Sequence, residues 1–138
     1  MFSNKEDKNV NQTNLVKIGA LLIHAAKIDE NYSVEEEKII KNTLLNLGAD
    51  EAHLDNLMTK AQQYEKDANQ ILDFTREVKN LEDNDKIKII KSLWKIIYSN
   101  KDADIYETNL MRRLGGLLYI DNKIMGDIKE KIKKENMQ

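Results

Sequence analysis

Apolar residues recur every three or four positions along most of the chain. Such stripes run through residues 13–28, 33–47, 54–61, 87–97, 110–118 and 124–132. This spacing places the apolar side chains on one face of an α-helix, which can then pack on a core. No segment alternates between apolar and polar residues, as a half-buried β-strand does. The pattern therefore predicts an all-α fold.

About seven helices are expected, and several of their ends carry recognisable signals. Ser33-Val34-Glu35-Glu36 matches a capping box, in which the serine oxygen and the Glu36 carboxylate accept hydrogen bonds from free backbone N–H groups. Gly48 suits the position just after a helix. The polar caps predict further helix starts at Asp50, Asp104 and Asp121, and a shorter helix is expected over residues 69–78.

The same stripes identify the expected core. Seven apolar residues should be buried: Leu22, Ile40, Leu44, Leu93, Trp94, Leu114 and Ile128. Gly19, Gly115 and Gly116 lie inside predicted helices, where each glycine costs about 1 kcal/mol relative to alanine. We expect these glycines to let neighbouring helices cross closely.

The chain repeats its pattern at an offset of 71 residues. Ser33 corresponds to Asp104, so that one predicted cap falls on another, and Leu22, Glu36 and Asp50 correspond to Leu93, Glu107 and Asp121. Identical residues are few, but apolar positions fall on apolar positions across three helices. The repeat predicts two three-helix units related by a pseudo-two-fold axis, with the helix over residues 69–78 linking them.

Composition narrows the class of protein. The 138 residues suit one domain, and we expect a disordered polar arm over residues 1–12 and a helical domain over 13–135. A formal net charge of −2 argues against a nucleic-acid-binding domain. No apolar run is long enough to enter a membrane, and the N-terminus lacks the apolar core of a signal peptide. The absence of cysteine excludes disulfides and thiolate sites, so a cytoplasmic protein is expected.

Two acidic corners stand out from the repeat. The first corner contains Asp29, Asn31, Ser33 and Glu36, and the second corner contains Asn100, Asp102, Asp104 and Glu107. In both corners, the last three residues lie two, four and seven positions after the first. Oxygen ligands at alternate positions, closed by a helix glutamate, suit a hard cation such as Ca²⁺ or Mg²⁺. The candidate metal ligands are Asp29, Asn31, Glu36, Asp102, Asp104 and Glu107. The same residues also fit a simpler interpretation, two helix N-caps with acidic first turns.

These corners also carry a family resemblance. Ile28-Asp29-Glu30-Asn31-Tyr32-Ser33-Val34-Glu35-Glu36-Glu37 resembles the acidic corner of the tellurite-resistance TerB-like family, and Asp73-Phe74-Thr75-Arg76-Glu77-Val78 resembles its middle segment. Similarity continues through Leu93-Trp94-Lys95, Ile105-Tyr106-Glu107 and Met111-Arg112-Arg113-Leu114. The resemblance implies about seven helices in a two-fold repeat, divalent-metal binding, a link to stress, and relatives that include the N-terminal domain of a DnaJ-type co-chaperone. The sequence departs from the family at Glu30 and Lys101, which replace its glycine, and at Asn100, which replaces an aspartate.

No catalytic constellation is visible, so we do not expect an enzyme. His24 and His53 are the only histidines, they lack metal-ligand spacing, and both are expected to face solvent. Two functions from different classes remain open. One is a small TerB-like binding module that responds weakly to divalent cations and docks onto partner proteins. The other is a structural or protein-interaction domain with no metal role, whose acidic corners are only caps.

Overall fold

A computed structural model describes residues 12–27, 32–67, 76, 78–79, 81–99, 105–118 and 120–136. Over these residues the fold is all-α, as predicted. Six α-helices and one 3₁₀ turn follow one another: α2 (Gln12–Ala26), α3 (Val34–Asn46), η1 (Glu51–His53), α4 (Leu54–Asp67), α6 (Asp83–Ser99), α7 (Ile105–Leu117) and α8 (Asn122–Asn136). The linking helix expected over residues 69–78 falls almost wholly outside the described residues, as does nearly all of the expected arm over 1–12.

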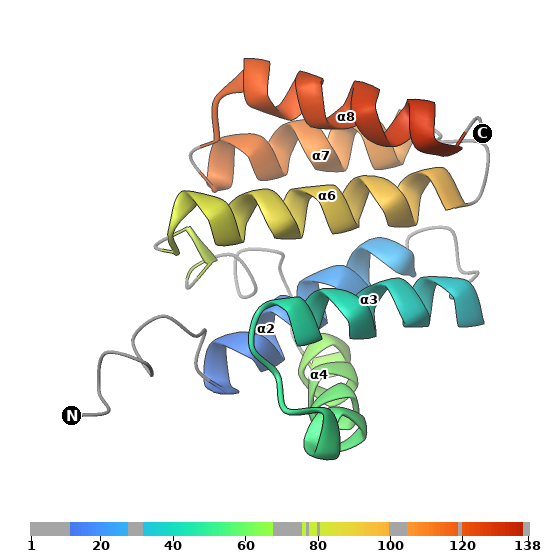
Figure 1. The fold of residues 1–138 in the computed structure, drawn as a ribbon, viewed down its shortest axis with the longest axis vertical. Helices are drawn as coiled ribbons and strands as arrows, with labels where there is room; N and C mark the ends of the chain where they lie inside the picture. Colours follow the sequence, from blue (N-terminus) through green and yellow to red (C-terminus); the bar gives the residue numbers. More distant parts are fainter. Residues whose placement is uncertain are drawn as a thin grey trace.

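The helices form two groups that meet at α6. In Figure 1, α6, α7 and α8 lie above α2, α3 and α4. Helix α2 packs most extensively on α4, and α6 on α8, while α6 also contacts both α2 and α3. Among the described helices, none is both long enough and apolar enough to span a membrane.

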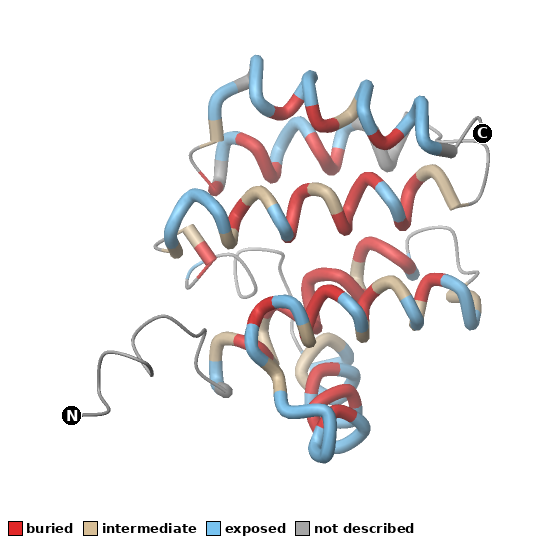
Figure 2. Tube along the Cα trace, viewed as in Figure 1, coloured by how far each residue is buried: buried red, intermediate tan, exposed pale blue. Residues whose placement is uncertain are grey.

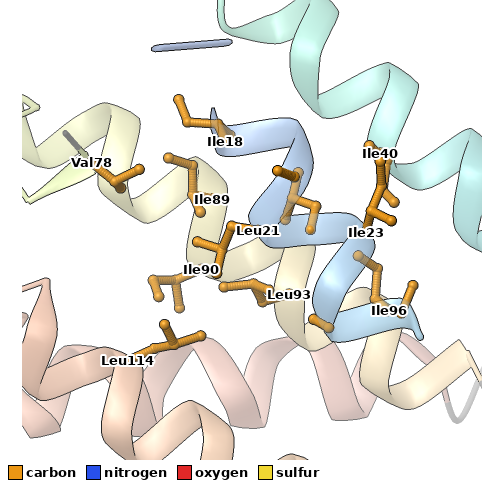
Figure 3. Close-up of a cluster of buried hydrophobic side chains, with 14 of the residues drawn as sticks. Ile18, Leu21, Ile23, Ile40, Val78, Ile89, Ile90, Leu93, Ile96 and Leu114 are labelled. Atoms are coloured by element: carbon orange, nitrogen blue, oxygen red, sulfur yellow. The ribbon is translucent and has the colours of Figure 1, made fainter. Parts of the chain in front are cut away.

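The apolar faces of both groups share one core. All seven residues predicted to be buried are buried: Leu22, Ile40, Leu44, Leu93 and Leu114 at 0%, Trp94 at 4% and Ile128 at 7% exposure. Figure 2 shows buried positions along the inward faces of both groups, and Figure 3 shows Leu93 and Ile90 of α6 beside Leu21 of α2. Between α3 and α6, the hydroxyl oxygens of Thr43 and Ser92 lie 2.7 Å apart and form a buried hydrogen bond. The sequence register of these helices is therefore confirmed.

Helix ends recur at the spacing found in the sequence. The first residues of α2, α3 and η1 are 12, 34 and 51, and those of α6, α7 and α8 are 83, 105 and 122. Each pair differs by 71. The Ala49 N–H donates to the Leu44 carbonyl, and 71 residues later the Ile120 N–H donates to the Gly115 carbonyl, both at 2.9 Å. The matching helix starts and turns agree with the predicted repeat, and the repeat and its two-fold axis stay a prediction.

Glycine has two different roles in the helices. A Cβ built on Gly19 would lie 2.9 Å from the Cβ of Ala61, so α2 and α4 approach closely at this point, as predicted. A Cβ on Gly115 would lie 3.3 Å from Met125, which also fits close packing of α7 on α8. A Cβ on Gly116 would meet no atom within 4 Å. The expectation that Gly116 serves helix packing is therefore wrong, because that position faces open space.

Turn residues mark the end of α3. Gly48 has φ = 110°, a left-handed conformation that is strained for residues with a side chain. The Gly48 N–H donates to the Leu45 carbonyl and the Ala49 N–H to the Leu44 carbonyl, which is the hydrogen-bond pattern of a Schellman turn. The predicted helix stop is confirmed. Asp50 then caps the 3₁₀ turn, since its side chain accepts from the Ala52 N–H at 3.0 Å.

Candidate functional site

The first acidic corner ends in a complete capping box. The Glu36 N–H donates to Ser33 Oγ at 3.1 Å, and the Ser33 N–H donates to Glu36 Oε1 at 2.8 Å. These two bonds fix the start of α3 by satisfying N–H groups that have no partner inside the helix. The predicted cap is confirmed. Its counterpart Asp104 lies outside the described residues.

Glu36 is enclosed by the fold. Its side chain has 0% exposure, and it is the one acidic residue among the buried polar residues of the described chain. Tyr32 lies next to it, and its hydroxyl oxygen is also buried. Burial, together with the negative charges of Glu37 and Glu36, raises the pKa of Tyr32 from 10.0 to about 12. The first turn of α3 therefore carries three acidic residues, Glu35, Glu36 and Glu37, one of which is buried.

Only one of the six predicted metal ligands has a described side chain. That residue is Glu36, while Asp29, Asn31, Asp102 and Asp104 lie outside the described residues. Glu107 falls within α7, but its side chain is not described. Within the part of the chain that the structure describes, no three histidine or acidic side chains converge as metal ligands would. Ligation by the two corners stays a prediction.

The histidines are held by acidic neighbours. His53 is exposed, as expected, and its Nδ1 lies 3.0 Å from Asp50 Oδ2. Two contacts lower the pKa of Asp50: the hydrogen bond from the Ala52 N–H has the larger effect, and the contact with His53 has the smaller one. His24 is not simply solvent-facing: its side chain is 35% exposed, and its Nδ1 lies 3.3 Å from Glu65 Oε2. The expectation for His24 is met only in part, because α4 packs on α2 and brings Glu65 to this histidine.

Surface pockets were not predicted from the sequence. A pocket of about 510 Å³ lies between α2 and the η1–α4 segment, with Lys17, His53, Lys60 and Tyr64 among its lining residues. A smaller pocket of about 160 Å³ lies where α6, α7 and α8 meet, and Trp94 forms part of its wall. The signals in the sequence for the second pocket are two glycines of its wall, Gly115 and Gly126, which lie inside predicted helices.

Comparison with known proteins identifies the family. The model of the family described as "Tellurite resistance protein TerB" matches residues 15–130, which is most of the chain. No curated protein and no solved structure matches the chain significantly. The all-helical fold and the capped acidic start of α3 agree with the resemblance found in the sequence. The chain therefore belongs to the TerB family of tellurite resistance proteins.

Proposed function

We propose that this protein is a small cytoplasmic binding module that binds a divalent cation weakly at its first corner and docks onto partner proteins. The observation that carries the cation proposal is the complete burial of Glu36. Burying an ionised carboxylate costs free energy unless other groups compensate its charge. The capping hydrogen bond and the helix dipole supply part of this compensation. A cation held by Asp29, Asn31 and Glu36 would supply more.

The chemistry of the donor set agrees with this assignment. Carboxylate and amide oxygens are the ligands of hard cations, and a carboxylate has two oxygens with about four lone-pair sites between them. Ca²⁺ or Mg²⁺ is favoured over zinc because the chain has no cysteine and neither histidine belongs to the corner. With few carboxylates, the site should have a dissociation constant of about 10⁻⁴–10⁻³ M.

The second corner should bind a cation more weakly. Lys101 brings a positive charge into it, and Asn100 supplies no negative charge. Asp102, Asp104 and Glu107 remain as its candidate ligands. We therefore expect one dominant site in each chain, at residues 29–36.

Calorimetric and thermal titration of metal-stripped protein with Ca²⁺ tests the cation proposal. Glu36→Gln is the informative variant, because glutamine also serves in a capping box while it removes the charge. Glu35→Gln is its matched control, since Glu35 is exposed on the same helical turn. For a dissociation constant of about 1 mM, 10 mM Ca²⁺ should stabilise the wild-type fold by about 1.4 kcal/mol. That corresponds to a rise in melting temperature of about 3–6 °C.

The calcium response should disappear in Glu36→Gln and in Asp29→Asn and persist in Glu35→Gln. Equal melting shifts in all four proteins would mean that the ion acts elsewhere, and the cation assignment would be wrong. Heat of binding that survives both corner substitutions would lead to the same conclusion.

A protein-interaction domain without a metal role is the second candidate. The observation that favours it is the hydrogen bond from the Ser33 N–H to Glu36 Oε1, which gives the carboxylate a structural role as a cap. In that case Ca²⁺ should leave the melting temperatures of all variants unchanged. Neither candidate includes catalysis, and a role in stress response is proposed on the basis of the family description.

A further inference from the structure

We infer that the pocket at Trp94 binds an acidic side chain of a partner protein, presented beside an apolar one. The pocket has a volume of about 160 Å³ and lies at the junction of α6, α7 and α8. Drug-sized ligands occupy pockets of about 300–1,000 Å³. The smaller volume suits one or two side chains of a peptide segment.

Positive charge lines this pocket. Lys129 of α8 places its Nζ 5.4 Å from the centroid of the Trp94 ring, and Arg112 of α7 is exposed at the wall. The indole Nε1 of Trp94 is buried and has no hydrogen-bond acceptor among the described residues. Asp127 and Glu130 are exposed on α8 but do not line the pocket. The chemistry of the wall therefore favours a carboxylate.

In the first half of the chain, the corresponding cation pairs with carboxylates of the same chain. Arg112 and Gly126 correspond, at the 71-residue offset, to Lys41 and Asp55. Lys41 Nζ lies 3.5 Å from Asp55 Oδ1 and 3.1 Å from Glu37 Oε1. The hydrogen bond to Glu37 and the charges of both acids raise the pKa of Lys41. In the second half the cation is retained, but Asp55 is replaced by glycine.

Arg112 differs from Lys41 in its charged neighbours. The position that corresponds to Glu37 is Thr108, which carries no charge. No ion pair joins Arg112 to another side chain in the described ranges. A carboxylate from a partner would restore at Arg112 the pairing that Lys41 makes within the chain.

The space at the mouth of the pocket comes from Gly126. At Gly115, the other glycine in the wall, a Cβ would lie 3.3 Å from Met125, so Met125 already occupies that position. Gly126 corresponds to Asp55, and a Cβ built on Gly126 would meet no atom within 4 Å. A glycine inside a helix destabilises it relative to alanine, and here helix packing does not require one. Gly126 instead leaves the mouth of the pocket open.

In the proposed complex, the carboxylate pairs with Arg112 and Lys129 at the mouth of the pocket. The neighbouring apolar side chain packs against Met125 and the Trp94 ring, which stacks on Tyr98 with centroids 5.8 Å apart. This inference deepens the partner-docking part of the proposed function and does not depend on the cation part. Loss of the calcium response would leave it standing, and loss of peptide binding would leave the cation site standing.

Nuclear magnetic resonance provides a direct test, because the chain has a single tryptophan. Its indole N–H gives one cross-peak, which reports on the pocket wall. We expect acetyl-Leu-Glu-Leu-amide to shift this peak saturably, with a dissociation constant of about 1–10 mM for so small a contact. The neutral analogue acetyl-Leu-Gln-Leu-amide should bind at least about fivefold more weakly. Inorganic phosphate is the third probe.

A matched pair of variants tests the role of the charge. Arg112→Gln should weaken binding of the glutamate peptide about fivefold or more, whereas Arg113→Gln should not, because Arg113 is exposed beside it but outside the pocket. Gly126→Asp should abolish binding by restoring the internal carboxylate. Open space at this position lets the fold remain intact, which circular dichroism would check.

Several results would overturn the inference. They are no saturable shift up to about 50 mM peptide, equal affinity for the glutamate and glutamine peptides, or equal weakening by both arginine substitutions. A comparable saturable shift with phosphate would make the pocket a general anion site and would exclude the proposed peptide recognition.

Discussion

Replacing Gly19 with alanine tests the close contact between α2 and α4. The new Cβ would lie 2.9 Å from the Cβ of Ala61 and 3.5 Å from Leu44 Cδ1. Two carbon atoms prefer a separation of about 3.5–4.0 Å, so the first contact is too short by at least about 0.6 Å. Neither Cβ can rotate away, because each is attached directly to its helix backbone. Helices α2 and α4 must therefore move apart.

Two opposing effects determine the size of the change. Alanine favours a helix over glycine by about 1 kcal/mol, while overpacking in a core costs about 1–3 kcal/mol. The expected net result for Gly19→Ala is a loss of about 1 kcal/mol in the free energy of unfolding. Gly116→Ala is the matched control, since Gly116 is exposed in α7 and its Cβ would meet no atom within 4 Å. That variant should gain about 0.5–1 kcal/mol.

Urea denaturation followed by circular dichroism measures both variants, and their midpoints should move in opposite directions. Adding Ala61→Gly to Gly19→Ala should relieve the contact and give a coupling energy of about 1–2 kcal/mol. If Gly19→Ala stabilises the protein as much as Gly116→Ala does, the close approach of α2 and α4 is wrong. A coupling energy near zero would contradict the proposed partner of the new methyl group.

Three further substitutions test the core, the cap and the acidic corner. Leu93→Ala should cost about 2–5 kcal/mol in urea melts, because Leu93 has 0% exposure, and a cost below about 1 kcal/mol would place it at the surface. Ser33→Ala should cost about 0.5–2 kcal/mol through loss of the bond to the Glu36 N–H, and a silent substitution would contradict the capping box. The pKa of Tyr32 is about 12 in the folded chain and about 10 in the unfolded chain. Its contribution to the free energy of unfolding is therefore complete below about pH 10 and is lost as the pH rises towards 12. Tyr32→Phe should remove this part of the alkaline loss of stability, about 1–2 kcal/mol for a half-buried group, and parallel stability curves for both proteins would contradict it.

Local signals in the sequence determine most of the helices. The capping residues Ser33 and Asp50 and the helix-stopping Gly48 act within one turn of backbone, so their roles can be predicted without knowledge of the fold. The register of the core follows from the 3.6-residue period, and Leu22 and Leu93 lie where it predicts. Helix boundaries follow less closely: the apolar stripe begins at residue 87, whereas α6 begins at Asp83.

The candidate site is only partly determined in this way. The sequence identifies the acidic corners by spacing, and it predicts the hydrogen bonds between Ser33 and Glu36 because they span three residues. It does not reveal that Glu36 is wholly buried or that the hydroxyl oxygen of Tyr32 is buried. Burial depends on which other helices cover a residue, and their positions are not encoded in its neighbours along the chain.

Tertiary structure decided the contacts that join distant segments. His24 meets Glu65 across 41 residues, and Thr43 meets Ser92 across 49. Gly19 and Gly116 look alike in the sequence, yet only Gly19 faces another helix at close range. The pocket at Trp94 likewise exists where three helices meet. The sequence by itself determined which face of each helix is apolar. The crossing of the helices decided which polar and charged side chains meet and where pockets form, because those contacts depend on distances between helices and not on positions along a single helix.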